Sequence, residues 1–178
     1  MDRASPDALE RARRVRLMIF DVDGVLTDGR LWYGPDGEEL KVFHSFDGHG
    51  MKMLARSGVA TALLSARSSR ATSARAAELG VAHVVQGAED KLAAFQALIG
   101  RLGLQAAAAG FMGDELVDLP VLRRCGFACA PREAPKLVRR HVHYSARAAA
   151  GAGAVREVCE LLMRAQGTLD QAHAPYLQ

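Results

Sequence analysis

The chain has 178 residues, of which 49% are hydrophobic and 24% are charged, and its formal net charge is +3. This size and apolar content suffice for one hydrophobic core, so we expect a single domain over residues 1–178. The basic residues are scattered and no apolar run approaches the roughly 20 residues of a membrane helix, which argues against nucleic-acid and membrane partners.

Short apolar runs alternate with longer amphipathic segments along the chain. The short runs predict buried strands at residues 15–20, 59–64, 82–85, 109–112 and 127–129. Residues 89–102 carry apolar side chains at helical spacing and precede Gly103, a residue typical of the position after a helix. Apolar residues at 155, 158, 159 and 162 predict a closing helix. Strands that alternate with helices predict an α/β fold, with a parallel sheet covered by helices on both faces.

Two segments stand apart from this alternation. Residues 30–46 contain two β-prone runs around a Pro-Asp-Gly turn, which predicts a β-hairpin flap after the first strand and no large cap domain. An isolated hairpin is marginally stable, so we expect Trp32 and Tyr33 of the flap to be buried between subunits. Residues 167–178 are expected to form a flexible C-terminal tail.

The N-terminal segment and the cysteines favour a cytoplasmic protein. Residues 1–14 are charged and helix-like, without the apolar centre of a signal peptide. The three cysteines, Cys125, Cys129 and Cys159, are odd in number and lack CxxC spacing, so neither a disulfide framework nor a zinc site is indicated. Both features fit a reducing compartment.

Acidic and phosphate-binding residue types recur where the predicted strands end. They are Asp21 and Asp23 after the first strand, Ser65 after the second, Lys91 after the third, and Asp114 and Asp118 after the fourth. The carboxyl ends of parallel strands share one edge of the sheet, so we expect these side chains to meet. Clustered aspartates repel one another and imply a cation, and an all-oxygen ligand set favours Mg²⁺. Ser65 and Lys91 can then hold the oxygens of a phosphoryl group.

The same residues predict phosphoryl transfer with an aspartate nucleophile. No Ser-His or Cys-His arrangement lies at a strand end, whereas a carboxylate can attack phosphorus and form an aspartyl-phosphate. We expect Asp21 to be the nucleophile. Asp23 is expected to protonate the leaving oxygen and later to activate water.

Four motifs carry a family resemblance: FDVDGVLTDG at 20–29, LLSAR at 63–67, Lys91, and GDELVDLP at 113–120. Together they resemble the haloacid dehalogenase superfamily of aspartate-nucleophile phosphatases. The flap, FDGHGMKML at 46–54 and GAVREVCELLMRAQG at 153–167 are similar to the 3-deoxy-D-manno-octulosonate 8-phosphate phosphatases of lipopolysaccharide synthesis. The resemblance runs from about residue 15 to about residue 171.

This resemblance implies a Rossmann-like fold and Mg²⁺-dependent hydrolysis of a sugar-acid phosphate to the free sugar acid and phosphate. It also implies a homotetramer in which flaps of neighbouring subunits pack together and the tail of one subunit closes the site of the next. By position, it makes Asp21, Asp23 and Asp114 the metal ligands, with Asp23 acting through its backbone carbonyl.

The remaining site residues follow from their positions in these motifs. Ser65 and Lys91 hold the phosphate, and Asp118 and Glu115 support the site from behind, Asp118 by orienting Lys91 or a metal-bound water. The segment Asp47, Gly48 and His49 is placed near the substrate mouth, where His49 either touches substrate or serves only as a polar residue at a helix start. Arg67 suits the substrate carboxylate or a sugar hydroxyl.

Four positions depart from the family pattern. Phe46 replaces an arginine, Ala152 a basic residue, Ala66 a glycine and Glu115 an aspartate. The two lost cations leave open a related phosphatase for another sugar phosphate or a nonulosonate phosphate. A catalytically idle oligomeric domain of the same fold is a third interpretation, although such chains tend to lose the nucleophile.

Overall fold

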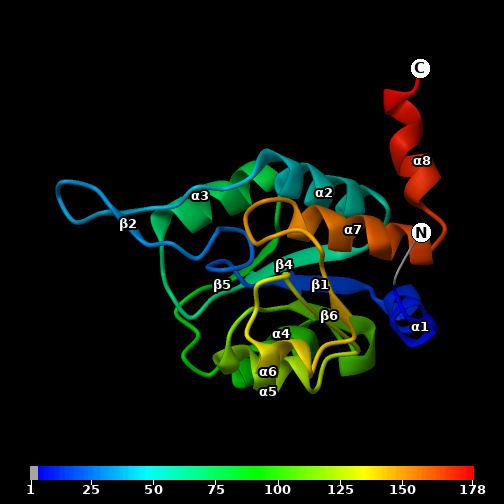
Figure 1. Ribbon diagram of the computed structural model, residues 1–178, viewed down its shortest axis with the longest axis horizontal. Coiled ribbons are helices and arrows are strands. Elements are labelled where there is room, and N and C mark those ends of the chain that lie inside the picture. Colours follow the sequence, from blue (N-terminus) through cyan, green and yellow to red (C-terminus); the bar gives the residue numbers. More distant parts are fainter. Residues whose placement is uncertain (1–3) are drawn as a thin grey trace.

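The computed structural model describes residues 4–178, which are built around a six-stranded sheet with the strand order β5-β4-β1-β6-β7-β8 (Figure 1). The strands are β1 Leu17–Phe20, β4 Ala60–Leu64, β5 His83–Val85, β6 Ala109–Met112, β7 Phe127–Ala130 and β8 Tyr144–Ser145. Every neighbouring pair is parallel. The predicted fold class is confirmed, and the five predicted strands are found. The edge strand β8 was missed because its two residues carry no apolar run.

Helices cover both faces of the sheet (Figure 1). They are α1 Pro6–Arg14, α2 Ser45–Arg56, α3 Arg70–Leu79 and α7 Ala154–Ala165 on one hydrophobic cluster, and α4 Lys91–Arg101, α5 Leu119–Leu122 and α6 Lys136–Arg139 on the other. Short 3-10 turns lie at η1 Ala106–Ala108, η2 Leu116–Asp118 and η3 Ala174–Tyr176. No helix within residues 4–178 has the length and apolar character that a membrane crossing requires.

The central strand β1 shows why the strands read as continuous apolar runs. It lies between β4 and β6, and all four of its residues are fully buried. Met18 and Phe20 point into one hydrophobic cluster, whereas Leu17 and Ile19 point into the other. A strand covered on both faces needs apolar side chains at every position, and it ends where the first charged residue, Asp21, follows.

The predicted flap is present as the antiparallel pair β2 Trp32–Tyr33 and β3 Glu39–Leu40, and it projects from one end of the molecule (Figure 1). Trp32 and Tyr33 are 52% and 59% exposed in the single chain. Exposed large apolar side chains are typical of interaction sites, so the burial of Trp32 and Tyr33 between subunits stays a prediction.

The C-terminal segment differs from its prediction in secondary structure. Residues expected to form an irregular tail instead form α8 Leu169–His173 and η3. Leu169 and Ala172, three residues apart, pack against the hydrophobic cluster under α7, and this gives a short helix one apolar side. Helix α8 lies at the end of the molecule opposite to the flap (Figure 1).

Candidate active site

The carboxyl ends of β1, β4 and β6 lie side by side, because Phe20 of β1 is in register with Leu63 and with Met112. The residues that follow these strands line one cavity of about 240 Å³, together with the first residue of α4. Its lining includes Asp21, Asp23, Ser65, Arg67, Lys91, Asp114 and Glu115. The predicted meeting of these residues at one sheet edge is therefore confirmed.

Lys91 forms the centre of a buried charge cluster. Its Nζ lies 2.5 Å from Asp21 Oδ2 and 2.6 Å from Asp118 Oδ1, and all three side chains are less than a tenth exposed. Burial lowers the pKa of the Lys91 ammonium, but the charges of Asp21 and Asp118 outweigh this effect and raise that pKa above its usual value. The lysine is therefore held protonated beside the nucleophile candidate.

Asp118 fixes both the lysine and the loop after β6. Its second oxygen, Oδ2, accepts hydrogen bonds from the backbone N–H groups of Asp114 at 3.0 Å and Glu115 at 3.1 Å. Both Asp118 oxygens thus have protein partners. This arrangement fits the predicted supporting role of Asp118, which orients Lys91 rather than facing the cavity itself.

Three carboxylates could hold a metal ion, since Asp21, Asp114 and Asp118 each offer an oxygen within 4.8 Å of the others. Burial, followed by the charge of Asp118, raises the pKa of Asp21 to about 6. Burial, followed by the charges of Asp21 and Asp118, raises the pKa of Asp114 to about 7. A cation between them would relieve this repulsion, and an all-oxygen donor set fits Mg²⁺. Because Asp21 and Asp114 line the cavity and Asp118 is not among its lining residues, Asp21 and Asp114 are the better side-chain ligands.

Gly24 shows how closely the chain is built around Asp114. A Cβ atom at this position would lie 2.1 Å from Asp114 Oδ2, and the residue has a positive φ of 78°. Only glycine combines this backbone conformation with room for the carboxylate. The glycine of the first motif therefore leaves room for Asp114, the metal-ligand candidate in the loop after β6.

Ser65 and Arg67 complete the cavity on the β4 side. Ser65 is 3% exposed, and its Oγ accepts a hydrogen bond from the backbone N–H of Arg67 at 3.2 Å. The hydroxyl hydrogen of Ser65 remains available for a phosphoryl oxygen. The Arg67 guanidinium reaches back to the flap, with Nη2 at 2.9 Å from Glu39 Oε1.

The flap also contacts Asp23, which sequence reasoning did not anticipate. Asp23 Oδ1 accepts a hydrogen bond from Nζ of Lys41, the residue that follows β3. Glu39 and Lys41 were missed because their partners depend on how the hairpin folds back over the sheet edge. The available signal was a pair of charges two residues apart, which places both side chains on the same face of a short strand.

Comparisons with known proteins identify the family of the chain. No family model matches the chain. The 3-deoxy-D-manno-octulosonate 8-phosphate phosphatase KdsC of Escherichia coli K12 is 41% identical over 168 residues, which cover 94% of this chain and 89% of that protein. The chain belongs to the 3-deoxy-D-manno-octulosonate 8-phosphate phosphatase family. The family predicted from the sequence motifs is thus confirmed.

Solved structures agree with this family assignment. The crystal structure of a probable YrbI family phosphatase from Pseudomonas syringae is 47% identical with a TM-score of 0.96, and the match covers 98% of this chain and 99% of that one. The phosphatase from Moraxella catarrhalis, crystallised with magnesium ion, phosphate ion and a KDO molecule, is 37% identical with a TM-score of 0.93. That match covers 96% of this chain and 98% of the other.

The start of α2 does not line the cavity that holds Asp21. Asp47 is 1% exposed and accepts hydrogen bonds from the backbone N–H groups of Gly153 at 3.2 Å and Arg156 at 2.8 Å, so it caps α7. A Cβ atom on Gly48 would lie 2.2 Å from Nη2 of Arg75. The sequence placed both residues at the substrate mouth, whereas the structure places them in the packing between helices.

His49 occupies a separate hollow on the outer side of α2. Its ring lies 5.3 Å from the ring of Tyr176, between centroids, in an edge-on arrangement. Phe46 and Arg156 line the same hollow, and Phe46 is 63% exposed. His49 is thus not among the lining residues of the Asp21 cavity in its own subunit, and its contact with substrate stays a prediction.

Glu115 shows what a longer side chain does at its position. Its Oε1 accepts a hydrogen bond from the backbone N–H of Leu116 at 2.6 Å and so caps the turn η2. The carboxylate of Glu115 therefore bends back onto its own loop, at the rim of the cavity, while Asp118 makes the inner contacts. Glu115 therefore stabilises its own loop, whereas Asp21 and Asp118 hold Lys91.

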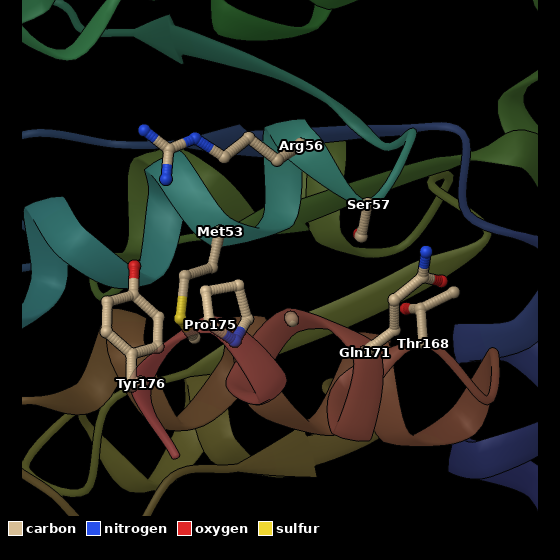
Figure 2. A pocket seen from close by; sticks show the side chains of 8 residues that line it. Met53, Arg56, Ser57, Thr168, Gln171, Pro175 and Tyr176 are labelled. Atoms are coloured by element: carbon tan, nitrogen blue, oxygen red, sulfur yellow. The ribbon is translucent and has the colours of Figure 1, made fainter. Parts of the chain in front are cut away.

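A larger cavity of about 590 Å³ lies between α2 and α8 (Figure 2). Its lining includes Met53, Arg56, Thr168, Gln171 and Tyr176, and Figure 2 shows residues of α2 on one side and residues of α8 and η3 on the other. The 8 residues that line it include no carboxylate. Size alone therefore does not identify the reactive site, which is the smaller, charged cavity at the sheet edge.

Proposed function

We propose that the chain is a Mg²⁺-dependent phosphatase that hydrolyses 3-deoxy-D-manno-octulosonate 8-phosphate to the free sugar acid and phosphate. The observation that carries the proposal is the buried Asp21 carboxylate, which lines the cavity, lies 2.5 Å from the Lys91 ammonium and has an oxygen within 4.8 Å of one of Asp114. Its relationship to the E. coli enzyme, at 41% identity over 94% of the chain, supports the same reaction.

The chemistry begins at Asp21. Its Oδ1 accepts a hydrogen bond from the backbone N–H of Val22 at 2.7 Å, so the carboxylate is held in one orientation. A carboxylate oxygen of Asp21 attacks phosphorus, the bond from phosphorus to the sugar oxygen breaks, and Asp23 gives its proton to that oxygen. Water then attacks the aspartyl-phosphate, Asp23 takes the proton of the water, and phosphate leaves with Asp21 regenerated.

Other residues of the chain hold the phosphoryl group during both steps. Ser65 donates its hydroxyl and Lys91 its ammonium to phosphoryl oxygens, which places the phosphorus beside Asp21. Asp21 and Asp114, with the backbone carbonyl of Asp23, would hold Mg²⁺. When bound, that ion supplies positive charge to the carboxylates and to the oxygens of the transferring group.

The proposal extends to assembly and cellular role. The exposed apolar flap residues Trp32 and Tyr33 support a homotetramer in which neighbouring flaps pack together. Helix α8 lies opposite to the flap (Figure 1), so the tail would close the site of a neighbouring subunit rather than its own. We place the enzyme in the cytoplasm, in the synthesis of lipopolysaccharide precursors.

A phosphate-release screen tests the proposed substrate. The purified chain is incubated with 3-deoxy-D-manno-octulosonate 8-phosphate, a nonulosonate phosphate and simple hexose phosphates, each with Mg²⁺ and with a chelator. We expect the highest kcat/KM for the octulosonate ester and none without metal. Because Phe46 and Ala152 replace basic residues, a higher kcat/KM for another ester would reassign the substrate. No release from any ester would refute the phosphatase itself.

A further inference from the structure

Lys41, the lysine of the flap, has a buried side chain although its neighbours in the sequence are exposed. The side chain of Lys41 is 3% exposed, whereas Leu40 and Val42 on either side of it are 49% and 69% exposed. A buried ammonium loses several kcal/mol of hydration unless charged partners replace the water. The flap therefore turns this one charge inward for a partner at the sheet edge.

The partners form a chain of alternating charges. Nζ of Lys41 donates a hydrogen bond to Asp23 Oδ1 and lies 3.0 Å from Glu39 Oε1. Glu39 Oε1 also accepts from Nη2 of Arg67 at 2.9 Å. Burial raises the pKa of Glu39, but Lys41 and Arg67 outweigh it and lower that pKa overall, so Glu39 stays ionised. Glu39 thus holds the two cations, and Lys41 in turn holds Asp23.

This cluster leaves the two oxygens of Asp23 in different environments. Oδ1 is engaged by Lys41, whereas Oδ2 is buried without a hydrogen-bond partner among the described residues and lies 3.9 Å from Nε of Arg67. An unpaired buried acceptor costs about 1–3 kcal/mol. Such an atom beside the nucleophile is suited to a partner that the protein does not supply, such as the leaving oxygen of a phosphate ester or a water molecule.

We propose that Lys41 is a positioning residue for the reaction: its ammonium holds Oδ1 of Asp23, so that Oδ2 is the atom that gives a proton to the leaving oxygen and later takes one from water. The inference rests on the proposed phosphatase function. Because Lys41 belongs to the flap, the reaction then depends on the flap lying against the sheet edge. Glu39 and Arg67 hold the flap there.

Two substrates with different leaving groups test this role. The sugar-acid phosphate leaves as an alkoxide that needs a proton, whereas p-nitrophenyl phosphate leaves as a weakly basic phenolate that does not. Replacing the ammonium in Lys41→Met should therefore lower kcat/KM for the sugar-acid phosphate by about 10²-fold. For p-nitrophenyl phosphate we expect a loss of less than about 3-fold, because protonation contributes little there.

Matched variants separate positioning from folding. Lys41→Arg keeps the charge and should recover most of the lost kcat/KM, and Lys136→Met, at an exposed lysine of α6, should leave both substrates unaffected. Should Lys41→Met fail to fold, Lys41→Gln carries the same test. Equal losses with both substrates, or no loss with either, would overturn the inference. A wild-type chain that hydrolyses no phosphate ester would instead refute the proposed function.

Discussion

Two regions of this molecule bury carboxylates, yet they use them in opposite ways. At the start of α2, burial raises the pKa of Asp47, but both of its oxygens accept backbone N–H groups at the beginning of α7. At the sheet edge, burial also raises the pKa of Asp21 and Asp114, and there the charges of neighbouring carboxylates raise it further. In the first region backbone N–H groups compensate the one carboxylate, whereas in the second the three clustered carboxylates Asp21, Asp114 and Asp118 have the single ammonium of Lys91 among them.

The surroundings of a buried carboxylate, rather than its pKa, indicate whether it is reactive. A raised pKa is common to both regions and does not separate them. What separates them is their surroundings: Asp47 faces two backbone N–H donors away from the cavity, while Asp21 and Asp114 line the cavity and lie close to each other. Oxygens that repel one another across a cavity favour a bound cation, and that cation can in turn attract a phosphoryl group.

We expect the largest loss of activity at Asp21. Asp21→Asn keeps the shape of the side chain but removes the nucleophile, so the rate of phosphate release should fall by about 10⁴-fold or more. Because the substitution removes one of several repelling charges, the thermal midpoint should not fall. Rates are measured by phosphate release and folding by circular dichroism. Asp28→Asn, in the exposed turn before the flap, is the control and should be fully active. Activity of Asp21→Asn near that of the wild type would remove Asp21 from the role.

The next effect concerns the missing positive charge. Mg²⁺ at about 100 times its Kd should raise the free energy of unfolding by about 2.7 kcal/mol, because only the folded chain gathers the ligands. Asp114→Asn should lose most of this stabilisation and also the Mg²⁺-dependent activity. Chelation should abolish wild-type activity, and added Mg²⁺ should restore it. Differential scanning fluorimetry with and without Mg²⁺ measures the first effect. An equal shift in the wild type and in Asp114→Asn would place the ion elsewhere.

The sequence predicted the sheet-edge region because its residues obey a local rule. Asp21, Ser65 and Asp114 follow buried apolar strands, and parallel strands place their carboxyl ends together whatever the loops do. No comparable rule covers Asp47. Its partners, Gly153 and Arg156, lie 106 and 109 residues further along the chain, and only the packing of α2 on α7 brings them together.

The contact of the flap with Asp23 and the helix in the tail were missed for the same reason. From the sequence, Lys41 resembles a surface charge, because its partner Asp23 is reached only when the hairpin folds back. Helix α8 depends on the packing of Leu169 and Ala172 against the hydrophobic cluster that includes α7. Short elements have little propensity of their own, so tertiary contacts decide their structure.

Substitution of Asp47 should lower stability rather than activity, which is the reverse of the effect expected for Asp21. Asp47→Ala leaves the N–H groups of Gly153 and Arg156 without an acceptor, and we expect the free energy of unfolding to fall by about 1–3 kcal/mol. Because Asp47 does not line the cavity, kcat/KM should stay within a few-fold of the wild-type value. Asp47→Asn keeps one acceptor oxygen and should lose less stability. Urea denaturation and steady-state kinetics measure the two quantities. A large loss of kcat/KM with unchanged stability would return Asp47 to the substrate-binding set.

The smallest effect tests whether the α2 face serves a site in another subunit. Tyr176, in the turn η3 after α8, contacts His49 on α2. Helix α8 lies at the end of the molecule away from the flap (Figure 1). Ending the chain after Gly167 removes the partly buried Leu169 and Ala172, which should lower the thermal midpoint by about 2–4 °C, the shift expected for about 1 kcal/mol. If the tail closes a neighbouring site, KM or kcat should change several-fold, a larger effect than the loss of packing explains. Kinetics identical to those of the full chain would confine the tail and the α2 face to packing within one subunit. In that case the contrast between the reactive sheet edge and the structural α2 start would hold for the whole assembly.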